Sequence, residues 1–327
     1  SRRRHTISFH VTGVQTCALP IYRDKHHAKR KIDPNIACKA KARLCVGGQR
    51  DPDLGVKEME VDAPTASRHS LLLGLQVALV RGWLVSIGDI RAAFLNGVEA
   101  PRSLFFKQPV RGIPGLQPGQ LIEILKGVFG LSTSPKLWWI RLSSELTQIT
   151  FQVHGKDYRI IQNDIDPCVF QVLRVDGEGH QVCGLIFTHV DDLMVMADPA
   201  IQGCLEASIQ ARFPVDEWER DRFDYVGCEY HVTKEEVNIT QTGYVQSRLN
   251  KVKIPAHQVE TDVVDSATKE LNRSVVGCLS WLAKQTRPDL QFMVAQTQKS
   301  QANPIVADVK WSNSIVEIGR ASCRERV

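Results

Sequence analysis

Three carboxylates lie at places in the sequence where a carboxylate is unusual. Asp89 lies at the end of the apolar segment WLVSIGDI, and Asp191 and Asp192 interrupt the apolar segment GLIFTHVDDLMVMA. A carboxylate beside a buried strand is costly unless a cation or hydrogen bonds compensate it. Adjacent carboxylates also repel each other, and a divalent ion that prefers oxygen ligands, such as Mg²⁺, relieves that repulsion. The alternatives are a solvated Asp-Asp turn, and for Asp89 the N-cap of a following helix.

Apolar periodicity predicts the elements that would position these carboxylates. Residues 83–90 predict a strand that ends at Asp89, and residues 181–190 and 193–197 predict a tight hairpin with the Asp-Asp pair between its strands. Because strands and helices are mixed without regular alternation, the fold class expected is α+β. Further helices are expected over 67–82, 132–149, 201–213, 243–250, 274–286 and 290–298. Further strands are expected over 103–107 and 169–174, a strand that runs into a turn over 36–50, and a second hairpin from 224–230 and 236–240.

The two ends of the chain distort its overall charge. The 327 residues carry a formal net charge of +5. Residues 11–21 (VTGVQTCALPI) and 317–327 (EIGRASCRERV) resemble in-frame translations of sequencing-adapter oligonucleotides, so we expect 1–21 and 318–327 to lie outside the native fold. Without them the basic and acidic residues are equal in number, and global charge is no argument for nucleic-acid binding. A local excess of basic residues remains in the leader, 22–38, and the strand that follows it.

Composition excludes several classes of protein. Hydrophobic residues make up 43% and charged residues 24% of the chain, which is typical of a globular protein and excludes disorder of the whole chain. No run of about 18 apolar residues is present, so no membrane-spanning helix is expected. The scattered cysteines include no C-x-x-C pair, which indicates reduced thiols in an intracellular protein.

An ordered set of motifs resembles the reverse transcriptases of copia-type LTR retrotransposons. DIRAAFLNG (89–97) resembles their first catalytic motif, and HVDD (189–192) resembles their Y-V-D-D motif. KGVFGLSTSPKLW (126–138) resembles the block between the two. The matching blocks follow one another in family order over about residues 39–308, and this order makes the set specific. The other matching blocks are KARL…GG (41–48), DAPT (62–65), QPVRGIPG (108–115), YVG (225–227), QTGYVQSRL (241–249) and GCLSWLAKQTRPDL (277–290).

The resemblance implies a right-handed polymerase fold whose palm is a small antiparallel sheet backed by helices. Residues 39–250 would form fingers and palm, 251–310 a thumb or connection, and 311–327 would be mostly adapter-like. The implied activity is RNA-directed DNA synthesis with two Mg²⁺ ions, or Mn²⁺ in their place. Asp89 and Asp191 would be the main metal ligands, with Asp192 beside them and the Ile90 carbonyl as a further ligand.

The resemblance also assigns residues to the nucleotide. Phe94 would pack under the sugar and exclude a 2′-hydroxyl, and its alternative is an ordinary core Phe. Lys41 and Arg43 would contact the triphosphate from one face of a strand, and a solvated basic strand is the alternative. Gly130, between Phe129 and Leu131, would help to position template and nucleotide, and Thr133 would lie near the incoming nucleotide.

Primer contacts are implied for His189 and for the hairpin that contains Tyr225 and Gly227, although a plain hairpin glycine explains Gly227 as well. Two positions depart from the family pattern. His189 replaces the usual Tyr, and Thr133 replaces the usual Gln. The turn at Gly47-Gly48 is also shorter than in the family.

The partners implied are an RNA template, a DNA primer and product, and deoxynucleotides. The RNase H and integrase regions of the same polyprotein are not seen in this sequence, and we expect the chain to be a truncated piece that works in a cytoplasmic virus-like particle or the nucleus. Two alternatives remain. One is a catalytically silent remnant of the transposable element that at most binds nucleic acid, and the other is a metal-dependent nuclease using the same carboxylates.

Overall fold

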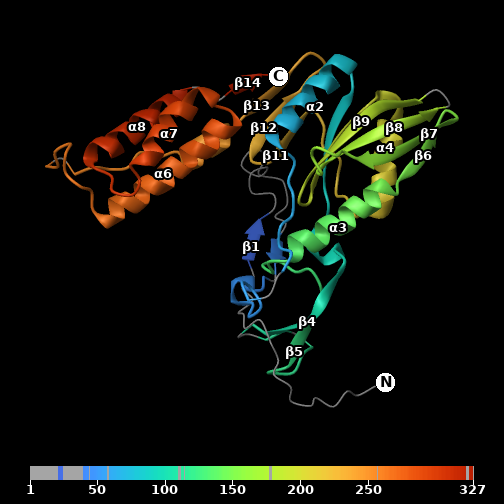
Figure 1. Cartoon of the computed structure of the whole chain (residues 1–327), viewed down its shortest axis with the longest axis horizontal. Coiled ribbons are helices and arrows are strands. Elements are labelled where there is room, and N and C mark those ends of the chain that lie inside the picture. The colour runs from blue at the N-terminus through green and yellow to red at the C-terminus, as the bar shows by residue number, and fades with distance from the viewer. Residues whose placement is uncertain are drawn as a thin grey trace.

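The computed structural model has three lobes: a central sheet with its covering helices, a helical lobe and a hairpin lobe (Figure 1). It describes residues 21–24, 40–43, 45–56, 59–109, 112–113, 115–176, 179–255, 257–321 and 324–326, and only the backbone of 21–24, 40–43, 179–180 and 324–326. Of residues 1–21, which we expected to lie outside the native fold, only Ile21 is among the described residues. In the described part of the chain, no helix combines the length and the apolar character that crossing a bilayer requires.

The central sheet has six antiparallel strands in the order β3-β10-β9-β8-β7-β6. Its middle strands are apolar on both faces because both faces are covered. In β10, Leu193 and Val195 belong to the core on one side, whereas Met194 and Met196 belong to the core on the other. The strands are β3 (Leu84–Asp89), β6 (Thr150–Val153), β7 (Lys156–Gln162), β8 (Val169–Asp176), β9 (Gly179–His189) and β10 (Asp192–Ala197).

Helices α3 (Ser134–Thr147) and α4 (Pro199–Arg212) cover one face of this sheet. Trp138 is the largest fully buried side chain of that layer. The other face is covered by α2 (Arg68–Arg81), which begins at the N-cap Ser67 and ends at Gly82 in the left-handed conformation.

A smaller sheet packs on the same side as α2 and shares its core. It consists of β11 (Arg222–Tyr225), β12 (Cys228–Val232), β13 (Val237–Thr240) and β14 (Arg324–Arg326) in that order. The hairpin expected from 224–230 and 236–240 is confirmed by the antiparallel pairing of β12 with β13, but residues 224–230 belong to two strands and not to one. Val226 and Gly227 both have positive φ, so the chain reverses there in a two-residue hairpin turn.

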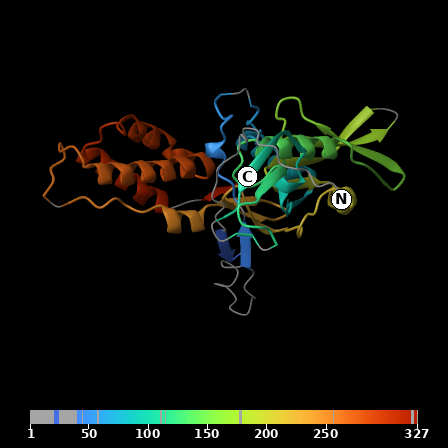
Figure 2. The same cartoon turned by 90° about the horizontal axis from the view of Figure 1, so that it is seen from below.

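The helical lobe has its own apolar core and lies apart from the central sheet in two perpendicular views (Figures 1 and 2). It contains α5 (Thr242–Arg248), α6 (Ser266–Gln285), η3 (Pro288–Leu290), α7 (Gln291–Lys299) and α8 (Val306–Ala321). Val245 and Leu249 already pack in this core, so the lobe begins before residue 251. Helix α8 continues into the segment that was expected to lie outside the fold, and Arg287 donates to the Ile318 carbonyl at 3.0 Å.

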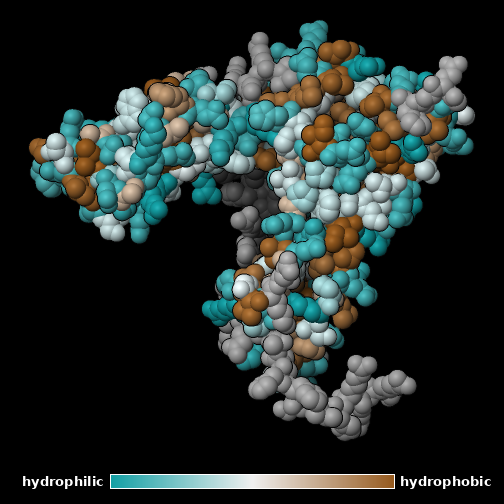
Figure 3. All heavy atoms as spheres, viewed as in Figure 1, coloured by the Kyte–Doolittle hydropathy of each residue, from teal (hydrophilic) through white to brown (hydrophobic). Residues whose placement is uncertain are grey.

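The hairpin lobe consists of β4 (Glu99–Lys107) and β5 (Leu121–Lys126), which pair antiparallel. Helix η2 (Ala93–Asn96) contacts both β5 and α3 and so connects this lobe to the central sheet. The remaining elements before the central sheet are η1 (Gly48–Arg50) and the antiparallel pair β1 (Ile21–Asp24) and β2 (Ala40–Arg43). The space-filling outline is concave between the hairpin lobe and the helical lobe (Figure 3).

Candidate active site

The three carboxylates come together at one end of the central sheet. Strands β3 and β10 pair so that Asp89 lies directly opposite Asp192, and directly opposed residues project to the same face. The Ile90 N–H donates to the Asp191 carbonyl at 2.8 Å, which fixes the turn beside the two strands. All three aspartates are half-buried, whereas Ile90 is fully buried. Asp192 is thus the cross-strand partner of Asp89, and Asp191 lies in the adjoining turn.

Burial and, after it, mutual repulsion determine the electrostatics of this end of the sheet. Burial, followed by the charges of Asp191 and Asp89, raises the pKa of Asp192 to about 7. Without a cation, the site therefore holds one of its carboxylates only partly ionised at neutral pH.

Oxygen ligands on mutually repelling carboxylates fit a divalent cation such as Mg²⁺. Within the described chain, no three His, Cys, Asp or Glu side chains are grouped closely enough to hold an ion by themselves. This matches the usual protein environment of Mg²⁺, in which one or two carboxylates bind the ion while water and substrate phosphates complete its shell. The residues that fit this role are Asp89, Asp191 and Asp192.

The turn that carries Asp191 is strained. Val190 has φ of 58°, in the left-handed region that β-branched residues rarely adopt. The indole N–H of Trp138 donates to the Val190 carbonyl at 2.5 Å. Trp138 is buried in the core, and its hydrogen bond supports the turn.

His189 and Tyr225 form the apolar side of the site. Their rings meet edge to face with centroids 6.2 Å apart. Burial lowers the pKa of His189, and the charge of Asp191 opposes that shift only in part, which favours the neutral imidazole. Tyr225 is only 2% exposed, so its side chain packs against His189 from the interior and does not face solvent.

A second group of candidate residues lies where the chain enters the hairpin lobe. Phe94 is half-buried, and its ring meets the ring of Phe129 edge to face with centroids 5.3 Å apart. Gly130 has φ of 89°, and a Cβ there would lie 1.9 Å from the Val46 carbonyl oxygen. Gly48 donates its N–H to the Gly130 carbonyl at 2.9 Å. The Gly47-Gly48 turn and the 126–138 motif are therefore in direct contact, which sequence order alone did not predict.

The remaining nucleotide candidates are placed less completely. Lys41 and Arg43 lie on β2 opposite Arg23 and Ile21, two residues apart and thus on one face, but their side chains lie outside what the structure describes. Thr133 is half-buried immediately before α3, and its side chain makes no capping hydrogen bond.

The hairpin turn at Val226-Gly227 contacts the helical lobe. A Cβ on Gly227 would lie 3.6 Å from the ring of Trp281, which lies on the exposed side of α6 with Arg273 and Lys284. Sequence reasoning missed Trp281. The signal was present, because Trp281 is an aromatic residue on the otherwise polar face of a predicted helix.

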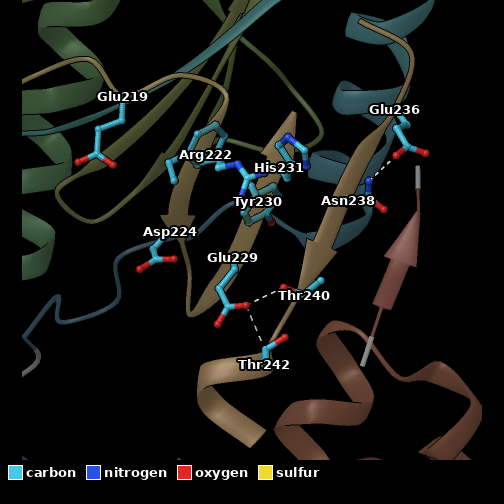
Figure 4. Close-up of a pocket in the computed structure, with 11 residues that line it drawn as sticks. Glu219, Arg222, Asp224, Glu229, Tyr230, His231, Glu236, Asn238, Thr240 and Thr242 are labelled. Carbon is cyan, nitrogen blue, oxygen red and sulfur yellow. Dashed lines mark hydrogen bonds between the residues drawn. The ribbon is translucent and has the colours of Figure 1, made fainter. Parts of the chain in front are cut away.

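A hollow of about 680 Å³ lies on the outer face of the small sheet (Figure 4). Its carboxylates include Asp224 and Glu229, which are cross-strand partners. Burial and the charges of Glu229 and Glu219 raise the pKa of Asp224. Glu229 also accepts hydrogen bonds from the Thr240 hydroxyl and the Thr242 N–H, at 2.6 and 3.2 Å. An acidic lining of this kind disfavours phosphate groups.

Comparison with known proteins establishes the family. A family model described as reverse transcriptase (RNA-dependent DNA polymerase) matches residues 18–264. The chain belongs to the reverse transcriptase family. The match contains Asp89, Asp191 and Asp192, and it ends before most of the helical lobe.

Relatives of this reverse transcriptase domain are plant retrotransposon polyproteins. The chain is 25% identical over 286 residues to the retrovirus-related Pol polyprotein from transposon RE2 of Arabidopsis thaliana, covering 83% of this chain and 18% of the relative. The corresponding polyprotein from transposon RE1 of Arabidopsis thaliana is 25% identical over 267 residues, covering 78% and 17%. That from transposon TNT 1-94 of Nicotiana tabacum is 21% identical over 284 residues, covering 81% and 20%. The chain thus spans about a fifth of the length of these relatives.

Proposed function

We propose that this chain catalyses RNA-directed DNA synthesis by transfer of a nucleotidyl group from a deoxynucleoside triphosphate to a primer 3′-hydroxyl. The observation that carries the proposal is the register of β3 and β10, which places Asp89 opposite Asp192 with Asp191 in the adjoining turn. In a chain of the reverse transcriptase family, this pattern supports a metal-dependent phosphoryl-transfer site.

The three lobes then correspond to a right-handed polymerase. The central sheet with α3 and α4 is the palm, the hairpin lobe with β1 and β2 belongs to the fingers, and the helical lobe is the thumb. The concave outline between hairpin lobe and helical lobe supports this assignment, because a template–primer duplex needs an open channel between them.

In this proposal Asp89, Asp191 and Asp192 hold two Mg²⁺ ions, or Mn²⁺, and the Ile90 carbonyl adds a ligand. When bound, such ions activate the primer hydroxyl and neutralise the leaving pyrophosphate. The chain's own part is to hold the carboxylates at a fixed spacing, because positioning and charge neutralisation carry most of the catalysis in phosphoryl transfer.

The nucleotide lies on the Phe94–Phe129 pair in this proposal. Phe94 is held by Phe129 and by the core behind it, so its ring is rigid enough to exclude a 2′-hydroxyl by contact. Gly130 lets the backbone approach closely, while Thr133, Lys41 and Arg43 contact the nucleotide and its phosphates.

The primer end lies against His189 and the turn that contains Gly227. Since Tyr225 is buried, its contribution is to hold this turn and the His189 ring. The adjacent Trp281, Arg273 and Lys284 on α6 offer an aromatic ring and two cations to the duplex backbone. The polyprotein context of the relatives supports cooperation with other domains of a polyprotein. The family resemblance implies that RNase H and integrase regions are among them.

Primer extension by the full chain tests this proposal. With poly(rA)/oligo(dT), dTTP and Mg²⁺, we expect extension that EDTA abolishes. Asp191→Asn should lower the rate by at least about 100-fold, because electrostatic stabilisation of the transition state is lost. Its affinity for template–primer should stay near that of the unmodified chain, since backbone contacts carry binding.

A matched control is Asp176→Asn, which removes an exposed carboxylate of the same sheet beside Arg174 and should leave extension unchanged. Folded protein that binds template–primer without extending it would support the silent remnant instead, and His189→Tyr with Thr133→Gln would then be the first variants to make.

A further inference from the structure

The outer edge of β3 is covered by residues 213–220, which we call the edge segment. It runs antiparallel to β3, with Ile87 and Glu219 exchanging backbone hydrogen bonds of 3.0 and 2.9 Å. The Asp216 N–H donates to the Asp89 carbonyl at 3.0 Å, and the Asp216 carboxylate pairs with the Arg91 side chain. The backbone at Asp89 is therefore held between β10 on one side and the edge segment on the other.

This contact depends on a glycine next to Asp89. A Cβ on Gly88 would lie 2.6 Å from Cγ1 of Val215 and 2.8 Å from the ring of Trp218, both in the edge segment. Contacts this short displace one of the two chains. The edge segment thus approaches β3 as closely as a residue without a side chain permits.

A buried ion pair attaches the end of the edge segment to the sheet. Glu206 of α4 has a side chain only 7% exposed and pairs with Arg220, which is more accessible. The other Glu206 oxygen accepts hydrogen bonds from the Ser86 hydroxyl of β3 at 2.6 Å and from the Gln202 amide at 2.8 Å. One carboxylate consequently links α4, β3 and the edge segment.

A buried charge of this kind contributes little to stability, because desolvation offsets much of the attraction and an apolar replacement often serves as well. The gain that remains is geometric, because the bonds of the Glu206 carboxylate to Arg220, Ser86 and Gln202 favour one arrangement of α4, β3 and the edge segment. The amide oxygen of Gln202 is the one atom of this group without a hydrogen-bond partner among the described residues. Glu206 and Arg220 lie outside the carboxylate site but control the strand that ends in it.

We propose that Glu206 and Arg220 are positioning residues that keep the edge segment on β3 and thereby hold the Asp89 carboxylate where a divalent cation binds. The inference rests on the proposed function, in which Asp89 binds metal. The charge of Glu206 and the absence of a side chain at Gly88 both keep the edge segment on β3. Substitutions at the two positions should therefore weaken metal binding in the same way.

Mn²⁺ binding to the full chain with template–primer, followed by electron paramagnetic resonance, tests the placement directly. Glu206→Gln and Gly88→Ala should each weaken Mn²⁺ binding on the order of tenfold, as loss of a group that orients a metal ligand does. In primer extension the Mg²⁺ requirement should rise while the KM for template–primer stays unchanged. Hydrogen exchange should show faster exchange at the Asp216 and Glu219 amides.

Two controls match these changes away from the edge segment. Glu145→Gln removes a carboxylate that pairs with Arg141 and Arg212 between α3 and α4. Gly203→Ala adds a methyl group on α4 where nothing lies within 4 Å. Neither should change Mn²⁺ binding. If Glu206→Gln fails to fold, Arg220→Gln breaks the pair from its exposed end, and Arg220→Lys should restore part of the binding.

Unchanged Mn²⁺ binding in Glu206→Gln or Arg220→Gln and in Gly88→Ala, with faster exchange in the edge segment, would overturn the positioning role. A chain that binds no Mn²⁺ would overturn it as well. If the chain binds Mn²⁺ but extends no primer, the proposed function fails, while comparison of the variants still decides the role of the edge segment.

Discussion

The carboxylate end of the central sheet and the outer face of α6 hold their polar groups in opposite ways. At the first, Asp89 and Asp192 are set by strand register, and a buried N–H from Trp138 supports the turn between β9 and β10. On the second, Trp281, Arg273 and Lys284 project from a helix whose opposite face supplies the packing. The first site is rigid because its backbone is bonded on both sides, and the second is adaptable because its side chains have few neighbours.

The difference teaches what each region can do. Chemistry on a phosphate requires ligands fixed within a fraction of an ångström, which only interlocked strands provide here. A surface that follows a duplex backbone of any sequence needs charge and area but little precision. Three changes measure how far this contrast extends.

The largest effect is expected from the charge at Asp192. Burial and the neighbouring Asp191 and Asp89 raise its pKa to about 7, so ionising it opposes folding. Stability that is present at low pH is therefore lost as the pH rises from about 4 through about 7, by up to about 4 kcal/mol in the absence of metal. Asp192→Asn should escape this loss, and urea unfolding in EDTA near pH 5 and near pH 8 should show its advantage growing with pH.

Mg²⁺ provides the complementary measurement, because an ion bound at the carboxylates should stabilise the unmodified chain at the higher pH and narrow its gap to Asp192→Asn. Asp176→Asn, far from this end of the sheet, serves as the reference. An advantage of Asp192→Asn that is equal at both pH values would show that the three carboxylates do not repel one another as described.

A pair of tryptophans gives the next largest contrast. Trp138→Phe removes the N–H bonded to the Val190 carbonyl and leaves that partly buried carbonyl without its donor, which should lower the free energy of unfolding by about 1–3 kcal/mol. Trp281→Phe on the exposed face of α6 should change it by no more than about 0.5 kcal/mol. The urea midpoints of the two variants give the comparison. Equal losses in the free energy of unfolding would contradict the distinction between a fixed and an adaptable region.

The smallest effect is expected at the turn itself. Val190→Gly removes the strain of a β-branched residue at a φ of 58°. After subtraction of the entropy cost of glycine, the free energy of unfolding should rise by about 0.5 kcal/mol. Val226→Gly, at φ 48° in the hairpin of the small sheet, makes the same exchange away from the carboxylates and should gain similarly. A loss at Val190 alone, measured by thermal unfolding, would mean that packing of its side chain outweighs the strain.

Local patterns predicted much of what surrounds the site. The strand ending at Asp89 and a hairpin at Asp191-Asp192 are confirmed, because apolar runs separated by a short polar turn are visible in a single sequence. The turn consists of Val190 and Asp191, so Asp192 belongs to β10 and not to the turn as expected. Helix α2 is also confirmed between its two caps. Strands β6 and β7 were missed, since both contain many polar residues and lie at the open edge of the sheet.

The ends of the chain show a different limit. Residues 318–321 looked foreign from their letters, yet they complete α8, and a Cβ on Gly319 would lie 3.2 Å from both Leu249 and Leu282 in the core of the helical lobe. Resemblance to an adapter sequence carries no information about packing. Whether a residue can take part in an amphipathic helix depends on which face of the helix it occupies.

The sequence by itself determined the residue types, the order of the motifs and the local elements, because spacing and turn chemistry act over a few residues. Tertiary structure decided that Asp192 faces Asp89, that Tyr225 is buried under His189, and that residues 213–220 lie against β3. The register between distant strands depends on which faces of the sheet are covered. The helices that cover those faces lie far away in the chain. Local sequence therefore specifies the carboxylates, and the assembled sheet specifies how they lie relative to one another.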